Sequence, residues 1–151
     1  MSTPARAAWR DLDPELAYAV LRLRVDVFVV EQACPYPEID GRDLEPATEH
    51  VWLPGPGGEP VGAYLRVLSG GRDEEGVRRV GRVVTAPSAR GHGLAGRLLD
   101  DVVDRHGSGP LVLDAQAHLA HWYARWGFVP NGPEFLEDGI PHVPMRREPT
   151  A

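Results

Sequence analysis

Residues 89–99, ARGHGLAGRLL, hold the side chains and spacing with the clearest chemical potential in the chain. Gly91, Gly93 and Gly96 have the spacing G-x-G-x-x-G, and an apolar stripe typical of a helix follows them. A glycine-rich turn that opens a helix presents unpaired backbone N–H groups at the positive end of the helix dipole. Arg90 adds a guanidinium group, which suits phosphate. The segment therefore predicts a site for a phosphate-bearing ligand.

The same glycine spacing occurs in dinucleotide-binding proteins, and Asp114 stands where their ribose-binding acid would be expected. The spacer TAPSAR, which contains Pro87, argues against this interpretation because the first glycine of a dinucleotide turn directly ends a strand. Too few residues follow the turn to build a second mononucleotide-binding half. The dinucleotide interpretation therefore ranks low.

The composition is typical of a globular protein, and we expect a single domain over residues 1–151. The 151 residues are 42% apolar and 25% charged, and they contain no apolar run long enough for a transmembrane helix. The N-terminal residues lack the apolar core of a signal peptide and Cys34 is the sole cysteine, which together predict a cytoplasmic protein. A net charge of −6 argues against nucleic-acid binding, and the absence of lysine excludes a P-loop lysine.

The elements that must position the glycine turn follow from hydrophobic periodicity. Asp13 as N-cap and Pro14 begin an amphipathic helix that ends before the proline-rich loop at Cys34. Pro141 and Pro144 place the last strand at an edge of the sheet. The other expected elements are helices over residues 93–106 and 118–128 and strands near residues 49–53, 60–68, 77–85, 111–115 and 139–148. Together they predict a mixed α/β sheet with helices on both faces.

A second frame fits the glycine segment. Arg90, Gly93 and Ala95 match the signature Q/R-x-x-G-x-G/A of the GCN5-related N-acetyltransferases, the GNAT family. The longer stretch VVTAPSARGHGLAGRLL resembles the acetyl-CoA motif of that family, including the proline in the spacer. Further along, HWYARWGF resembles the family segment Y-x-x-x-G-F. The stretches RLRVDVFVVEQACPYPEIDGRD, DAQAHL and DGIPH resemble the ElaA-like branch, so the resemblance covers most of the chain.

The resemblance implies an α+β fold of the GNAT type, with a mostly antiparallel central sheet, a splayed strand pair and helices on both faces. It implies an N-acetyltransferase that uses acetyl-CoA and no metal. The acetyl group would pass to a primary amine of a small molecule or peptide by direct attack in a ternary complex. Tyr123, in the family's tyrosine position, would protonate the departing CoA thiolate. Gln116 stands where many relatives have an asparagine that bonds the cofactor arm, and its longer amide leaves this contact open. The residues implied to bind the cofactor are Val83, Val84, Thr85, Arg90, Gly91, His92, Gly93, Leu94, Ala95, Gly96 and Gln116.

A strongly basic acceptor amine also requires a general base, because it must lose a proton before it can attack. The loop that follows Cys34 is expected to flank the acceptor, and its carboxylates Glu38, Asp40 and Asp43 would favour a cationic amine. The candidates for the base, which the residues leave open, are Glu31, Glu49, His50, His118, His142 and a water molecule.

Two alternatives remain beside the enzyme. One is a non-catalytic sensor that binds acetyl-CoA or CoA, although Tyr123 in the tyrosine position of the family favours an enzyme. The other is the dinucleotide-binding protein. No nucleic-acid or membrane partner is expected. The identity of the acceptor and the oligomeric state, including a homodimer, stay open.

Overall fold

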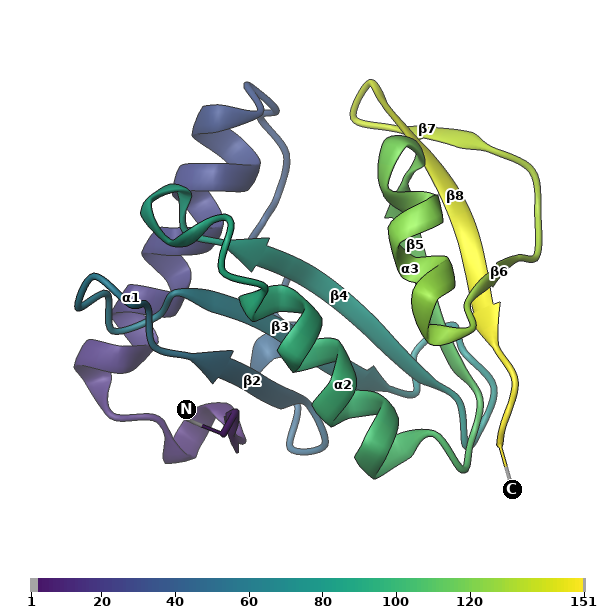
Figure 1. Cartoon of the computed structure of the whole chain (residues 1–151), viewed down its shortest axis with the longest axis horizontal. Helices are drawn as coiled ribbons and strands as arrows, with labels where there is room; N and C mark the ends of the chain where they lie inside the picture. Colours follow the sequence, from purple (N-terminus) through teal and green to yellow (C-terminus); the bar gives the residue numbers. More distant parts are fainter. Residues whose placement is uncertain (1–2, 151) are drawn as a thin grey trace.

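The computed structural model describes residues 3–150, which form one mixed sheet of eight strands with helices on both faces (Figure 1). The strand order is β1-β2-β3-β4-β5-β8-β6, and β7 also pairs with β8. Neighbouring strands run antiparallel except for β4 and β5, which run parallel. The strands are β1 (Ala5–Ala7), β2 (Glu49–Leu53), β3 (Ala63–Ser69), β4 (Arg78–Thr85), β5 (Leu111–Gln116), β6 (Val129–Pro130), β7 (Phe135–Glu137) and β8 (Ile140–Arg147).

Helix α1 (Pro14–Arg24) begins as its sequence predicts, because the Asp13 carboxylate accepts a hydrogen bond from the Leu16 N–H at 2.9 Å. It continues as a π-helical segment, Val25–Glu31. Helix α2 (Leu94–His106) has the highly amphipathic pattern of a helix that packs on a sheet. Helix α3 (Ala120–Tyr123) is a single turn flanked by the 3-10 turns Ala117–Leu119 and Ala124–Trp126.

The core lies on both faces of the sheet's central strands. Six of the seven residues of β3 are buried, as expected for a strand covered from both sides. Helix α2 crosses β2, β3 and β4 in the front of Figure 1, and α1 lies behind them. The buried residues of α2 are Leu94, Leu98, Leu99 and Val102.

Strands β4 and β5 separate soon after they meet. They pair only at Arg78 with Leu111 and at Arg79 with Val112, and they then diverge towards their C-terminal ends (Figure 1). Residues 80–85 of β4 therefore have no strand on this edge within the described part of the chain. The mixed sheet, the splayed pair and the helices on both faces confirm the predicted fold class.

Two predictions about the elements are wrong. The last strand, β8, is not an edge strand, because β5 pairs with one side of it and the short strands β6 and β7 with the other. Pro144 lacks the N–H of a ladder residue, but its carbonyl still accepts a hydrogen bond from the Asn131 N–H at 2.9 Å. The helix predicted over residues 118–128 is mostly 3-10 turns, although it does end at Gly127, whose φ is +89°. Strands β1, β6 and β7 were not predicted.

No helix within residues 3–150 is long and apolar enough to cross a membrane.

Candidate active site

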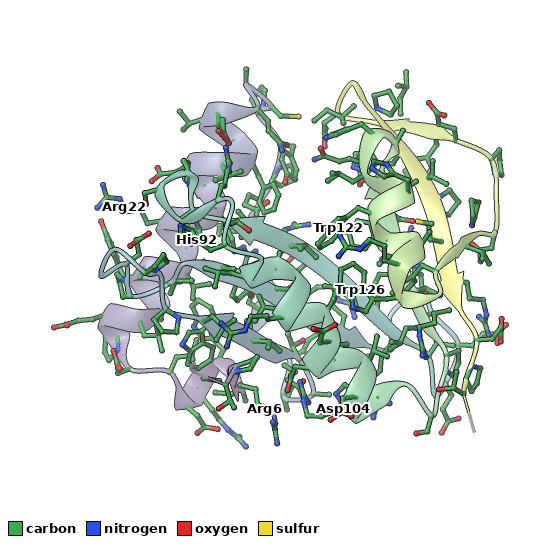
Figure 2. All side chains as sticks on the ribbon, viewed as in Figure 1. Arg6, Arg22, His92, Asp104, Trp122 and Trp126 are labelled. Atoms are coloured by element: carbon green, nitrogen blue, oxygen red, sulfur yellow. The ribbon has the colours of Figure 1, made fainter. Side chains whose placement is uncertain are left out.

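A cavity of about 690 Å³ fills the splay between β4 and β5. Residues 80–85 of β4 line one wall. Leu113, Asp114 and Gln116 of β5 line the other, together with Trp122 and Tyr123 of α3. Figure 2 shows Trp122 and Trp126 pointing from the α3 region into the space towards α2. The splay therefore provides a cavity large enough for a substrate.

A β-bulge shapes the β4 wall. Arg82 and Val83 together stand opposite Leu65 of β3, because the register shifts between Tyr64 and Arg66. Arg82 has φ +53°, a left-handed conformation that a non-glycine residue adopts at a cost. Its side chain holds it there, since Nε donates to the Glu38 carboxylate at 2.8 Å and Nη2 to the Glu38 carbonyl at 3.1 Å.

The glycine turn opens helix α2, as its sequence predicts, and has an open backbone. Gly91 and Gly93 have φ values of +85° and +69°, and a Cβ added at either would meet no atom within 4 Å. The N–H groups of residues 91–94 find no acceptor in the part of the chain that the structure describes. The open space and the free donors at the α2 N-terminus fit the pyrophosphate of a CoA molecule.

The other residues of this segment differ in where their side chains lie. Leu94 is buried in the core, whereas Ala95 lines the cavity and His92 is exposed on the outer side of the turn (Figure 2). Gly96 faces Trp126, because a Cβ placed on it would lie 3.5 Å from the indole ring. The Trp126 Nε1–H also donates to Asp100 of α2 at 2.8 Å.

Arg90 is engaged by a carboxylate from a distant part of the chain. Its Nη1 and Nη2 donate to the two carboxylate oxygens of Glu31 at 2.9 and 2.7 Å, and both side chains remain nearly half exposed. Glu31 is the last residue of the π-helical segment. The hydrogen bonds from Arg90 lower the pKa of Glu31, so the pair is ionised at neutral pH. A phosphate at this place would compete with Glu31 for the guanidinium.

Tyr123 lines the cavity from α3 and is 6% exposed. Its ring packs edge to face against Trp122 and Phe128, with centroid distances of 4.9 and 6.3 Å. Among residues 3–150 its hydroxyl has no hydrogen-bond partner. Burial raises the pKa of Tyr123, so the phenol stays protonated and can donate a proton or a hydrogen bond into the cavity.

Two hydrogen bonds bridge the two sides of the splay. The Gln116 side-chain amide donates to the Gln32 side-chain oxygen at 3.3 Å, and the Cys34 thiol donates to the Asp138 carbonyl at 3.2 Å. Both connect the segment after the π-helix with the C-terminal part of the sheet. Burial, followed by the charges of Asp138 and Glu137, raises the pKa of the Cys34 thiol. Cys34 is therefore a protonated thiol and a poor nucleophile.

The structure brings two of the candidate bases to the cavity, His118 and His142. Within the described residues Glu31, Glu49 and His50 do not line it. Glu49 pairs with Arg105 at 2.6 Å. His50 is fully buried, with its ring nitrogens 2.7 Å from the Tyr64 hydroxyl and 3.0 Å from the Asp43 carbonyl.

The acidic loop does not present free carboxylates to an acceptor. Glu38 and Asp43 are buried and receive the Nε and Nη1 of Arg24 at 2.7 Å each, and Asp40 receives the Arg66 Nη2 at 2.6 Å. Arg24 is itself fully buried. Arginine already pairs with all three carboxylates, so their attraction for a cationic amine stays a prediction.

This charge cluster, consisting of Arg24, Glu38, Asp40, Asp43, Arg66 and Arg82, is the main feature that the sequence reasoning missed. One signal was available, since Arg24 follows Leu23 on the apolar face of α1, four residues after Val20 and three before Val27. An arginine in a core stripe requires a buried carboxylate partner.

Comparison with known proteins assigns the family. The acetyltransferase (GNAT) domain matches residues 25–149, which span the splayed strands, the glycine turn and Tyr123. The chain belongs to the GNAT acetyltransferase family. It is therefore a transferase, and members of this family take their acyl group from acetyl-CoA or another acyl-CoA. The family assignment replaces the dinucleotide interpretation.

Curated relatives support the ElaA-like branch of the GNAT family. A UPF0039 protein of Mycobacterium tuberculosis is 51% identical over 148 residues, which cover 97% of this chain and 94% of the relative. The Escherichia coli protein ElaA is 40% identical over 151 residues, which cover 93% of this chain and 95% of the relative.

Solved structures agree with the GNAT fold. An acyl-CoA N-acyltransferase from Pseudomonas aeruginosa superposes with a TM-score of 0.83 at 43% identity, covering 97% of this chain and 99% of that one. Escherichia coli ElaA superposes with a TM-score of 0.85 at 34% identity, covering 98% of this chain and 100% of that one.

Within residues 3–150, no group of three or more His, Cys, Asp or Glu side chains is arranged to hold a metal ion.

Proposed function

We propose that this GNAT protein is an acetyl-CoA-dependent N-acetyltransferase that acetylates a primary amine by direct attack within a ternary complex. One observation carries the proposal. A single cavity connects Arg90 and Ala95, at the N-terminus of α2, with the splayed backbone of β4 and with the buried phenol of Tyr123. A phosphate-binding end, a backbone wall and a proton donor thus share one space.

The cofactor residues follow from this arrangement. The amides of residues 91–94 and Arg90 would hold the pyrophosphate, and the unpaired backbone of Val83, Val84 and Thr85 would bond the pantetheine arm. Backbone N–H groups along the same edge would stabilise negative charge on the thioester oxygen during attack. Gln116 reaches the cavity from the opposite strand, where its amide already bonds Gln32.

Tyr123 suits the role of the acid. The reference pKa of a thiol is about 8.5 and that of a free phenol is about 10, so the phenol holds its proton at neutral pH before the reaction. It gives this proton to the sulfur only as the thiolate forms. Burial raises the pKa of Tyr123 further and keeps the proton on the phenol until that moment. Direct attack by the amine is favoured over transfer through an acyl-cysteine intermediate, because the Cys34 thiol is protonated and donates a hydrogen bond to the Asp138 carbonyl.

The proposal is tested by release of CoA thiol from acetyl-CoA with a panel of primary amines, including amino acids, polyamines and short peptides. Mass spectrometry should find the acetylated amine in an amount equal to the thiol released. Acetyl-CoA without an amine gives the background rate. Tight binding of CoA by calorimetry without turnover of any amine would contradict the proposal and support the non-catalytic sensor.

A further inference from the structure

His142 of β8 stands at the cavity in a defined orientation. It is opposite Gln116 of β5 in the antiparallel register, and both residues line the cavity. Its side chain is 12% exposed. The imidazole stacks on the Phe135 ring of β7 with a centroid distance of 5.7 Å and an interplanar angle of 24°. The Phe135 ring of β7 therefore holds the imidazole from one side.

The hydrogen bonding of His142 fixes which nitrogen carries the proton. Nδ1 lies 2.7 Å from the carbonyl oxygen of Ile140. A carbonyl can only accept, so Nδ1 must be the donor, and Nε2 of the neutral ring is left with its lone pair. The carboxylate of Glu137 lies 3.9 Å from Nε2, too far for a hydrogen bond, so it does not occupy the lone pair.

We propose that His142 is the general base that removes a proton from the acceptor amine, a role that rests on the proposed function. An alkylammonium acceptor gives one proton to His142 Nε2, and the neutral nitrogen attacks the thioester carbon. The N–C bond forms and the C–S bond breaks. Tyr123 gives its proton to the leaving sulfur, and a second proton from the attacking nitrogen then restores the Tyr123 phenol. His142 returns its proton to solvent. The products are the amide, the CoA thiol and one proton.

The other candidates are less suited to this role. His118 also lines the cavity but is exposed and has no fixing hydrogen bond among the described residues. Titratable groups that line the same cavity include Glu137 of β7, Asp138 of the β7-β8 turn, Asp114 of β5, Tyr123 of α3, and Cys34 and Tyr36 from the loop after α1. Arg72 and Arg79 neutralise Asp114, whereas Tyr36 donates to Glu38. His142 is the group in this set that combines a free lone pair with a fixed ring.

The proposal is tested with His142→Asn, whose side-chain amide can keep the donor to the Ile140 carbonyl but cannot accept a proton. We expect kcat/KM for the best amine of the panel to fall at least about 100-fold at pH 7, with the Kd for CoA within about twofold of the wild type. The deficit should shrink as the pH rises towards the pKa of the amine, because a neutral amine no longer needs the base. His118→Asn and the exposed His121→Asn should stay within about threefold of the wild type.

Three results would overturn the role of His142. One is a kcat/KM within threefold of the wild type, another is a deficit that stays constant with pH, and the third is a loss caused by His118→Asn instead. The tautomer is measured independently of any acceptor by long-range ¹⁵N–¹H correlation spectra of the wild type, with His142→Asn as the assignment control. The Nδ1–H form is expected, and the Nε2–H form would contradict the proposal. An inactive wild type would instead refute the proposed function.

Discussion

At the residue scale, the pairing of Arg90 with Glu31 bears most directly on the proposed site for the acyl donor. The sequence predicted that Arg90 lies beside the glycine turn, and its side chain does line the cavity. That its partner is Glu31, 59 residues away, depends on where the π-helical segment ends and could not be predicted from spacing. The positions of the glycine turn before α2 and of Tyr123 at the cavity, by contrast, could be predicted because each rests on a local motif, and their roles stay predictions.

Glu31→Gln should tighten binding of CoA. The substitution releases the guanidinium of Arg90 for the pyrophosphate, and an exposed ion pair of this kind is worth a factor of about two to five in Kd. The gain, measured by calorimetry, should decrease as the salt concentration rises. Arg90→Gln should weaken binding, and Asp26→Asn, which breaks the exposed pair with Arg22 away from the cavity, should leave it unchanged. If Glu31→Gln weakened binding as much as Arg90→Gln, Glu31 would instead orient the arginine.

At the scale of elements, hydrophobic periodicity predicted the strands and helices that have several turns or alternations. It placed β2 and α2 within about one residue of their observed limits. It failed where an element is too short to show a period, as in β6 with two residues and β7 with three. The position of β8 depended on those two strands. The bulge in β4 was also unpredictable, because the sequence around Arg82 contains no glycine at the left-handed position.

The bulge predicts a difference between two substitutions of Arg82. Both Arg82→Gly and Arg82→Ala lose the bonds to Glu38, but glycine adopts a positive φ freely and alanine does not. Arg82→Ala should therefore be less stable than Arg82→Gly by about 1 kcal/mol in urea unfolding. Equal stability, or a more stable alanine variant, would show that the left-handed conformation is not maintained by the surrounding strands.

At the scale of the whole molecule, the charge cluster joins α1, the loop after Cys34, β3 and β4 into the wall beside the cavity. The acidic composition of this loop could be read from the sequence. Its ion pairs could not, because the paired side chains come from four separate segments. Arg66 bonds Asp43 at 3.1 Å in addition to Asp40. The cluster has three arginines and three carboxylates, so its charges balance within the interior.

Removing one carboxylate from the cluster should destabilise the fold. Asp43→Asn removes one of the two carboxylate partners of both Arg24 and Arg66, and it leaves the cluster with one uncompensated positive charge in a buried site, which costs about 3 to 5 kcal/mol. Glu45→Gln, at an exposed pair with Arg42, should cost less than about 1 kcal/mol. Urea unfolding of both variants measures the difference. Equal effects of the two substitutions would mean that the buried cluster contributes little.

The same cluster makes stability depend on pH. Burial alone would raise the pKa of Asp43, but the hydrogen bond and charge of Arg24 and the charge of Arg66 outweigh it and lower the pKa; Asp40 behaves similarly with Arg66. A carboxylate whose pKa is lowered by folding stabilises the fold at pH values above the ordinary carboxyl pKa of about 4. This stabilisation is lost as the pH falls below that value. The free energy of unfolding should therefore fall between about pH 5 and pH 2, and Asp43→Asn should flatten this slope.

The most direct test of the account is the effect of Tyr123→Phe on catalysis and binding measured in parallel. The substitution removes only the hydroxyl that lines the cavity and leaves the ring against Trp122 and Phe128. We expect kcat for acetyl transfer to the best amine of the panel to fall by about 10²- to 10⁴-fold, with the Kd for acetyl-CoA within about twofold of the wild type. An unchanged kcat would contradict the account, because the proton for the leaving thiolate would then come from elsewhere.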